Sequence, residues 1–440
     1  MIIHGAKTIR GRMQAPGDKS ISHRAAMMAA LAEGTSSIKN FSTSADCAAT
    51  LSCLAALGVV IKRDHNELAI TGVGRDGLRE PKQPLDCANS GTTMRLLAGI
   101  LAGQDFESTL TGDDSLRSRP MQRIIEPLQM MGARISSNDG RAPLVIYGQR
   151  NLKSISYELL VASAQVKSCI LLAGLNAAGR TEVIENQPTR DHTERMLRSF
   201  GVQIETGEVE REGENARSIA VNGPARLRSQ DISIPGDVSS AAYFIAAAAL
   251  LPGSSLDISD VGVNPTRALF LEQMRALGLD VEVIQTREAN NEPVGTIRAR
   301  GLQNQPSGRL NSPMTIDGLI VPQLIDELPL LAVAGSQIGG GIEIRDAAEL
   351  RVKESDRIAT TAQNLRAMGA QVEEFDDGLR VGGPTRLRGA KIDPRGDHRI
   401  AMAFTIAGLL AEGETEISDS DCVAVSFPEF FELLESVVES

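Results

Sequence analysis

Aromatic residues are scarce in this sequence, and one of them is missing altogether. The chain contains no tryptophan, and Phe, Trp and Tyr together make up 3% of its 440 residues. The core must therefore be built from Ala, Leu, Ile, Val and Met, and the smaller of these suit helices that approach one another closely. Few aromatic rings also leave few platforms for base stacking, and the net charge of −11 disfavours polyanionic partners. We therefore expect neither a nucleic acid nor a membrane surface as a partner.

Cysteine is also rare, and long hydrophobic runs are missing. The five cysteines are odd in number and show no metal-ligand spacing, so we expect buried free thiols in a reducing cytoplasm and no metal site. No apolar run reaches the roughly 18 residues of a membrane span, and residues 1–13 read as a charged strand rather than a signal peptide. The sequence therefore indicates a globular cytoplasmic protein, and its 440 residues predict two domains.

Six short polar loops, each leading into an apolar helix rich in Ala, Leu and Met, recur along the chain. They are P-G-D-K-S (16–20), N-S-G-T-T (89–93), S-A-Q-V-K (163–167), P-G-D-V-S (235–239), I-D-E-L-P (325–329) and R-G-D-H-R (395–399). The loops follow one another at intervals of roughly 70 to 90 residues, which indicates a repeat architecture.

A second element recurs between these loops, an amphipathic helix that ends in glycine and is followed by a strand. We predict such helices at 48–58, 121–132, 193–201, 266–278 and 356–369. The glycine can take the left-handed conformation that closes a helix. Each repeat therefore reads strand, helix, strand, helix, strand, strand, and the six repeats divide three and three near residues 228–234. The longer spacing at 285–306, which includes N-N-E-P, predicts an exposed insertion.

Basic residues occupy related positions in or beside the loops. They are Lys19, Arg24, Arg119, Lys353, Arg357 and Arg399. A helix N-terminus attracts anions, so a ring of such termini could enclose a polyanionic ligand. Solvated surface charge would explain any one of these residues, whereas six at related positions indicate a site for a small anion.

The most informative single segment is P-G-D-K-S-I-S-H-R. If Ser20 begins a helix, Ser20 and Arg24 share one face, and Lys19 lies beside the free N–H groups of the helix end. A hydroxyl, a guanidinium and an ammonium in one patch suit a phosphate or a carboxylate. An N-capped helix with incidental charge is the weaker alternative, because the motif follows a predicted strand.

Two carboxylates are candidates for proton transfer. Asp326 lies in an apolar stretch, where it is either a partly desolvated base or a helix cap, and capping is favoured for this residue considered alone. Glu354 lies in R-V-K-E-S-D-R, where Lys353 and Arg357 are four residues apart. That spacing fits an anion site and a solvated helix face equally well. No Ser–His–Asp or Cys–His nucleophilic set is recognisable.

Together these motifs resemble those of the 5-enolpyruvylshikimate-3-phosphate (EPSP) synthase family. The matching segments, in family order, are P-G-D-K-S-I-S-H-R, N-S-G-T-T-M-R, R-S-R-P-M, S-A-Q-V-K-S, R-V-K-E-S-D-R and D-H-R-I-A-M-A-F. The resemblance as a whole covers the chain from Gly11 to Phe430. The resemblance implies an α/β fold, a two-domain inside-out α/β barrel with three βαβαββ repeats in each domain. It implies one domain at 15–234 and another formed by 1–14 with 235–440, with the active site in the cleft between them.

The resemblance also implies an activity. The family joins phosphoenolpyruvate to the 5-hydroxyl of shikimate 3-phosphate and releases phosphate through a tetrahedral intermediate, with no metal or organic cofactor. Asp326 is then the base at the 5-hydroxyl, and Glu354 and Lys19 take part in proton transfer. The expected partners are these two small molecules alone, and we expect a monomer.

Residue by residue, the matching motifs imply two ligand sets. The shikimate 3-phosphate ligands are Lys19, Ser20, Arg24, Ser163, Ala164, Gln165, Arg190, Asp326 and Lys353. The phosphoenolpyruvate ligands are Lys19, Gly91, Arg119, Gln165, Arg357 and Arg399.

Two departures from the family pattern concern peripheral contacts. Val425 stands where some members have a lysine that contacts phosphoenolpyruvate, and Glu349 stands where some have asparagine.

Two alternative functions stay open. UDP-N-acetylglucosamine enolpyruvyl transferases share the fold but usually have a cysteine at the place of Asp114, and the S-I-S-H-R stretch fits them poorly. A non-catalytic anion-binding protein would not need Asp326 and Glu354.

Overall fold

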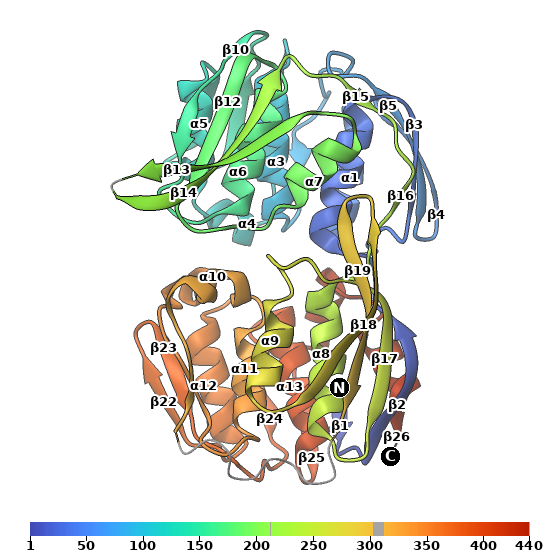
Figure 1. Ribbon diagram of the computed structural model, residues 1–440, viewed down its shortest axis with the longest axis vertical. Helices are drawn as coiled ribbons and strands as arrows, with labels where there is room; N and C mark the ends of the chain where they lie inside the picture. The colour runs from blue at the N-terminus through green and yellow to red at the C-terminus, as the bar shows by residue number, and fades with distance from the viewer. Residues whose placement is uncertain (212, 302–311, 440) are drawn as a thin grey trace. The chain divides into compact units, whose positions relative to one another are not determined.

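The computed structural model describes residues 1–211, 213–301 and 312–439, and the chain divides into two compact units (Figure 1). The central unit comprises Gly17–Ile234 and Ala289–Glu292. The terminal unit comprises Met1–Pro16, Pro235–Glu288 and Pro293–Ser440. The first boundary therefore lies after Pro16 rather than after residue 14, and a four-residue segment that the sequence assigned to the second domain belongs to the central unit.

The central unit places apolar helices inside and sheets outside (Figure 1). Its helices are α1 (Lys19–Leu31), α2 (Ala45–Ala56), α3 (Gly91–Ala102), α4 (Asp114–Ser118), α5 (Gln122–Met130), α6 (Ala164–Gly174) and α7 (His192–Ser199). Its strands are β3 (Ala32–Lys39), β4 (Val60–Asp64), β5 (Glu67–Val73), β6 (Leu85–Asp86), β7 (Glu107–Thr111), β8 (Arg134–Asn138), β9 (Arg141–Tyr147), β10 (Leu152–Lys153), β11 (Ser156–Glu158), β12 (Ala177–Glu185), β13 (Ile204–Arg211), β14 (Glu214–Gly223), β15 (Leu227–Arg228) and β16 (Ile232–Ser233).

Within the described residues, these strands form three sheets of similar plan. The sheet orders are β15-β3-β5-β4, β6-β7-β9-β8 and β10-β12-β14-β13, with β16 also paired to β3 and β11 to β12. Each sheet has a parallel pair at one side and an antiparallel hairpin at the other, for example β6 parallel to β7 and β8 antiparallel to β9. This is the βαβαββ repeat that the sequence predicts, with the first repeat closed by β15 and β16 from the end of the third.

The terminal unit repeats this plan. Its helices are α8 (Val238–Leu250), α9 (Leu269–Ala276), α10 (Val321–Leu324), α11 (Leu328–Gly335), α12 (Arg357–Ala367), α13 (His398–Leu410) and α14 (Phe430–Val437), with 3-10 turns η1 (Gly318–Ile320), η2 (Ala348–Val352) and η3 (Ser420–Val425). Its strands are β1 (Ile2–His4), β2 (Thr8–Gln14), β17 (Ser255–Gly262), β18 (Asp280–Ala289), β19 (Glu292–Arg300), β20 (Met314–Ile316), β21 (Ile342–Ile344), β22 (Val372–Phe375), β23 (Gly378–Val381), β24 (Lys391–Ile392), β25 (Glu414–Ile417) and β26 (Val438–Glu439). The sheet orders are β18-β19-β17-β2-β26, β20-β21-β23-β22 and β1-β25-β24.

The N-terminal strands complete two of these sheets. Strand β2 pairs with β17 in parallel, and β1 pairs with β25 in antiparallel fashion. The start of the chain therefore belongs to the same unit as its end, as the family resemblance implies.

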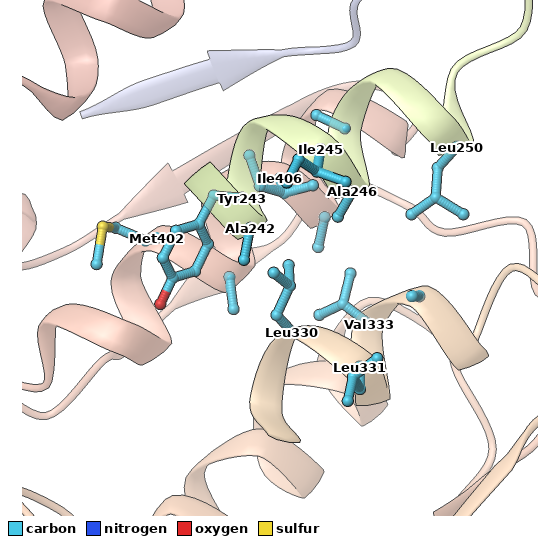
Figure 2. Close-up of a cluster of buried hydrophobic side chains, with 14 of the residues drawn as sticks. Ala242, Tyr243, Ile245, Ala246, Leu250, Leu330, Leu331, Val333, Met402 and Ile406 are labelled. Atoms are coloured by element: carbon cyan, nitrogen blue, oxygen red, sulfur yellow. The ribbon is translucent and has the colours of Figure 1, made fainter. Parts of the chain in front are cut away.

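The six loop-helices form the interiors of the two units. In the terminal unit, side chains of α8, α11 and α13, including Ala242, Leu330 and Ile406, pack against one another (Figure 2). Every residue of α8 is buried, which its Ala-rich sequence permits because small side chains let neighbouring helices come close. The six predicted loop-helices are confirmed as α1, α3, α6, α8, α11 and α13.

Polar loop residues cap most of these helices. The side chains of Asp18, Ser90 and Ser163 accept hydrogen bonds from backbone N–H groups in the first turns of α1, α3 and α6. Asp237 and Asp397 do the same for α8 and α13. The polar loops therefore start the helices and also leave their first N–H groups near the polar side chains of the same loops.

The glycine-ended helices are confirmed as well. Helices α2, α5, α7, α9 and α12 are followed by glycines that adopt a positive φ between 84° and 96°. These glycines are Gly58, Gly132, Gly201, Gly278 and Gly369. Only glycine takes this conformation without a steric penalty, so the prediction rests on backbone sterics.

The prediction of an exposed insertion is wrong for the described part of 285–306. Residues 285–301 belong to the hairpin β18–β19, and residues 302–306 lie outside the described residues. Asn290 and Asn291 both have a positive φ, which suits a tight hairpin turn. Glu292 is buried and contacts His192 Nδ1 at 2.8 Å, so the tip of the hairpin is packed within the central unit.

The cysteines of this chain are free thiols, and most of them are buried. Cys47, Cys53, Cys87 and Cys169 are buried free thiols, whereas Cys422 is half-buried. Burial raises the pKa of Cys47 and of Cys169 to about 12.

Among the described residues, no single helix has both the length and the apolar composition of a membrane span; Gly318–Leu324 and Leu328–Gly335 meet the criteria only as a pair bent by 107°.

The close packing of α3 on α6 leads to a stability prediction. A Cβ atom on Gly99 would lie 2.2 Å from the backbone carbonyl oxygen of Cys169, which a side-chain rotation cannot relieve. We expect Gly99→Ala to lower the free energy of unfolding by about 3 kcal/mol, the upper part of the usual range for overpacking, in urea titrations followed by circular dichroism. Gly207→Ala is the control, because a Cβ atom there meets nothing within 4 Å. Equal effects of the two substitutions would show that α3 and α6 do not pack in this way.

Candidate active site

The first cluster of predicted ligands lies in the central unit around Arg24. The Arg24 guanidinium is buried and donates to Thr193 Oγ1 at 2.6 Å, to Ser168 Oγ at 2.8 Å and to the carbonyl oxygen of Ser20 at 2.8 Å. Burial lowers the pKa of Arg24 to about 10, although Glu194 acts in the opposite direction. The group therefore keeps its positive charge at neutral pH in a largely desolvated place, which strengthens its attraction for an anion.

Arg190 and Lys19 add positive charge near this cluster. The charge of Arg190 is among the causes that lower the pKa of Arg24, as expected for two guanidiniums held close together. Lys19 begins α1, and its ammonium lies 2.9 Å from Asp46 Oδ2. Two like charges that are close in the folded chain suit a ligand of opposite charge between or beside them.

A second cluster in the central unit surrounds Gly91, the first residue of α3. A Cβ atom on Gly91 would lie 2.7 Å from Arg95 Nη1 and 3.6 Å from Arg119 Nη1, so two guanidiniums flank this glycine. Gln165 Oε1 accepts a hydrogen bond from Arg95 Nη1 at 2.6 Å, and Gln165 Nε2 donates to Thr92 Oγ1 at 2.9 Å. The structure therefore brings Gly91, Arg119 and Gln165 together, and it adds Arg95 to them.

The N-terminal end of α6 completes the central-unit residues. Ser163 caps this helix through its hydroxyl, and Ala164 is the first helical residue. Both are half-buried, and they directly precede Gln165. The predicted ligands of the S-A-Q segment thus lie at a helix N-terminus, where backbone N–H groups favour an anion.

The predicted residues of the terminal unit meet around Asp326. Its carboxylate oxygens lie 3.5 Å from Arg267 Nη1, 3.6 Å from Arg357 Nη1 and 3.5 Å from Arg399 Nε. The Asp326 side chain retains 21% exposure, whereas the three arginines are almost completely buried. The partly exposed Asp326 carboxylate could therefore accept a proton from the hydroxyl of a ligand on its open side.

The interpretation of Asp326 as a helix cap is wrong. Helix α11 starts at Leu328, its capping residue is Glu327, and no side chain accepts a hydrogen bond from its first turn. Glu327 instead accepts a hydrogen bond from the Ser239 hydroxyl and lies 3.8 Å from Arg399 Nη1. Asp326 is therefore left facing the arginines.

Arg357 is held by two further carboxylates. Its Nε donates to Asp397 Oδ2 at 2.8 Å and its Nη2 donates to Glu354 Oε2 at 2.6 Å. Burial opposes the charged form of Arg357, but Asp397 and Glu354 outweigh it and raise its pKa. Burial likewise acts to raise the pKa of Asp397, but Arg357 and His398 outweigh it and the pKa is lowered.

The interpretation of 351–357 as a solvated helix face is also wrong. The 3-10 turn η2 ends at Val352, and α12 begins only at Arg357. Lys353 has an extended backbone, and its ammonium pairs with Glu349 at 2.5 Å. Glu349, one of the two departures from the family pattern, is therefore the ion-pair partner of a predicted ligand.

Comparisons with known proteins show the family of this chain. The family model "EPSP synthase (3-phosphoshikimate 1-carboxyvinyltransferase)" matches residues 3–434. The chain belongs to this family. It is 51% identical to the 3-phosphoshikimate 1-carboxyvinyltransferase of Koribacter versatilis and 48% identical to that of Citrifermentans bemidjiense, with 99% of each chain covered in both cases. A solved EPSP synthase from Acinetobacter baumannii is 42% identical, with a TM-score of 0.86 over 100% of this chain and 98% of that one.

Family membership bears on one alternative from the sequence. The UDP-N-acetylglucosamine enolpyruvyl transferases are not favoured, because the EPSP synthase model covers nearly the whole chain. Asp114, at the place of their usual cysteine, lies in the short helix α4 with its side chain almost fully exposed and ion-paired to Arg117 at 2.6 Å.

Sequence reasoning missed several residues of these polar clusters. They are Asp46, Arg95, Ser168, Thr193, Arg267, Glu327 and Asp397. Arg95 and Asp397 stand inside recognised motifs, so proximity to Gly91 and to Arg399 could have indicated them. Arg267 offers no such signal, because it follows β17 in a segment without a recognised motif. Within the described part of the chain, no group of three or more His, Cys, Asp or Glu side chains is placed to hold a metal ion.

Proposed function

We propose that this protein transfers the enolpyruvyl group of phosphoenolpyruvate to the 5-hydroxyl of shikimate 3-phosphate and releases phosphate. The observation that carries the proposal is the Asp326 carboxylate among three buried guanidiniums in an EPSP synthase chain. The guanidiniums suit a multiply charged anion, and the carboxylate suits proton removal from a hydroxyl beside that anion.

We further propose which residues of each unit bind the two substrates. Arg24, Arg190 and the S-A-Q segment would hold the phosphate and ring of shikimate 3-phosphate. The proposed phosphoenolpyruvate ligands are Lys19, Gly91, Arg119 and Gln165 in the central unit and Arg357 and Arg399 in the terminal unit. Two anions that repel each other in water would thus be fixed side by side, which lowers the entropic and electrostatic parts of the barrier.

The proposed chemistry moves two protons. A proton added to C3 of phosphoenolpyruvate makes C2 electrophilic, and the 5-hydroxyl oxygen attacks C2 while Asp326 accepts the hydroxyl proton. The resulting tetrahedral adduct then loses a proton from C3 as the C2–O bond to phosphate breaks. Glu354 and Lys19 would carry the proton at C3, with Glu354 held in place by Arg357 at 2.6 Å. Each positioned acid or base contributes about 10²–10⁴-fold to such a rate.

A phosphate-release assay tests the proposal. With both substrates present we expect steady release of phosphate, and with either one omitted we expect none. Release with UDP-N-acetylglucosamine in place of shikimate 3-phosphate would favour the other transferase. Binding of both substrates without release of phosphate would favour a non-catalytic anion-binding protein.

We also propose that the protein acts as a monomer, since one chain carries both ligand sets. Sedimentation equilibrium tests this proposal.

A further inference from the structure

A group of buried charges lies next to the Arg24 cluster in the central unit. The ammonium of Lys167, on α6, lies 3.0 Å from Glu185 Oε2 and 2.8 Å from Glu194 Oε1, and all three side chains are completely buried. Burying charges has a desolvation cost that apolar side chains of similar size would avoid. A role other than stability would explain why the charges are there.

The group is joined to the predicted phosphate ligands through adjacent residues. Lys167 precedes Ser168, and Glu194 follows Thr193. The side-chain hydroxyls of Ser168 and Thr193 both accept hydrogen bonds from Arg24. The two hydroxyls also contact each other at 2.6 Å. Lys167 and Glu194 are therefore each connected to Arg24 through one peptide unit and one hydrogen bond.

The third member of the group secures the segment that carries Arg190. Glu185, the last residue of β12, accepts hydrogen bonds from Thr189 Oγ1 at 2.7 Å and from the Thr189 backbone N–H at 3.3 Å. Lys167 Nζ also donates to the Thr189 carbonyl oxygen at 3.5 Å. The residue before Arg190 is thus held at its hydroxyl, its N–H and its carbonyl.

Glu194 faces two cations. It pairs with Lys167, and it is also the strongest of the carboxylates that favour the charged form of Arg24. If Lys167 were neutral, the carboxylate of Glu194 would lose its ion-pair partner at 2.8 Å and would be drawn more strongly to Arg24. It would then compete with an incoming phosphate for the same guanidinium, because like charges repel strongly at a poorly solvated place.

We propose that Lys167 is a positioning residue for the phosphate of the acceptor substrate. By pairing with Glu194 it keeps that carboxylate from competing for Arg24, and through Glu185 and Thr189 it fixes the segment that carries Arg190. This inference rests on the proposed function, since it takes Arg24 and Arg190 as ligands of shikimate 3-phosphate.

Three variants test the inference: Lys167→Met, Glu194→Gln and the double variant K167M/E194Q. For Lys167→Met we expect the KM for shikimate 3-phosphate to rise about 10- to 100-fold, a loss of one to two factors of ten in affinity, while the KM for phosphoenolpyruvate changes less than about threefold. In the double variant the competing carboxylate of Glu194 is gone, so we expect its KM for shikimate 3-phosphate to fall at least about fivefold below that of Lys167→Met. It should stay about two- to fivefold above that of Glu194→Gln, because Lys167 no longer holds Thr189 beside Arg190.

The outcomes separate positioning from stability. Leu144→Ala, a fully buried change on β9, provides a variant whose melting temperature falls while both KM values stay at wild-type level. If Lys167→Met leaves the KM for shikimate 3-phosphate unchanged, the inference is wrong. If that variant does not fold, the comparison of K167M/E194Q with Glu194→Gln decides, and equal KM values for shikimate 3-phosphate in these two variants overturn the inference. A wild-type protein without turnover would instead contradict the proposed function.

Discussion

Replacing Asp326 with asparagine should reduce kcat by about 10²–10⁴-fold, the usual contribution of a positioned base. Asparagine has nearly the size and shape of aspartate, but its amide cannot take a proton from the acceptor hydroxyl. Substrate binding should change less, because Arg357 and Arg399 stay in place. Steady-state kinetics with both substrates, together with thermal melting, measure the two effects.

The rest of the cluster keeps its partners in this variant. Arg357 retains Asp397 and Glu354, and Arg399 retains the Ser239 hydroxyl at 2.8 Å. We therefore expect the fold to remain intact. Glu343→Gln is the matched control, since it removes a carboxylate of the same unit that pairs with Arg380 on β23, and its kcat should equal that of the wild type. An Asp326→Asn enzyme within threefold of wild-type kcat would rule out the role as base.

The elements of this fold could be predicted because their signals are local. Capping residues such as Asp18 and Ser90 lie within four residues of the N–H groups that they satisfy, and the closing glycines follow their helices directly. Local signals also mark the six repeats, so the βαβαββ plan was readable. The hairpin tip at Asn290 was not, because the sequence shows a polar turn but not the surface on which that turn is packed.

The site was predictable where a motif holds both the residue and its neighbours. Arg24 and Gln165 belong to such motifs, and the structure places both in polar clusters. Arg267 is different, because its partner Asp326 is 59 residues away and only the folded sheet order brings them together. The same limit explains the error over 351–357, where spacing alone cannot show that Arg357 is drawn inward by Asp397, 40 residues further on.

Replacing Arg357 with methionine should have the largest effect on stability. Arg357 and Asp397 are both almost completely buried, so methionine would leave the Asp397 carboxylate without its closest cation. Removing one partner of a buried ion pair costs about 3–5 kcal/mol of unfolding free energy. Arg380→Met is the control: this arginine is 46% exposed and pairs with Glu343, so a change of about 1 kcal/mol or less is expected. Urea titrations of both variants at pH 7 measure the difference.

The pH dependence of the unfolding free energy distinguishes the loss of this ion pair from a general loss of packing. In the wild type the pKa of Asp397 is lower in the folded than in the unfolded protein. The ionised carboxylate therefore stabilises the fold at pH values above its unfolded-state pKa, and this stabilisation is lost as the pH falls. In Arg357→Met, burial acts without the opposing guanidinium and raises the pKa of Asp397, so the variant gains stability as the pH falls and the carboxylate takes up a proton. The difference in unfolding free energy between the wild type and Arg357→Met should therefore become smaller from pH 7 towards pH 4. A gap that stays constant over this range would contradict the ion-pair explanation.

The double variant R357M/D397N separates the structural role of Arg357 from its role as a ligand. Asparagine can still cap α13, where Asp397 accepts from the Arg399 N–H at 2.9 Å, and it carries no charge that needs a partner. We expect it to recover most of the stability lost in Arg357→Met, which a double-mutant cycle would report as a coupling energy of about 2–3 kcal/mol. The KM for phosphoenolpyruvate should nevertheless stay raised at least tenfold, because the guanidinium that would bind the anion is gone. A double variant that regains both stability and wild-type KM would show that Arg357 holds the fold together without contacting the substrate.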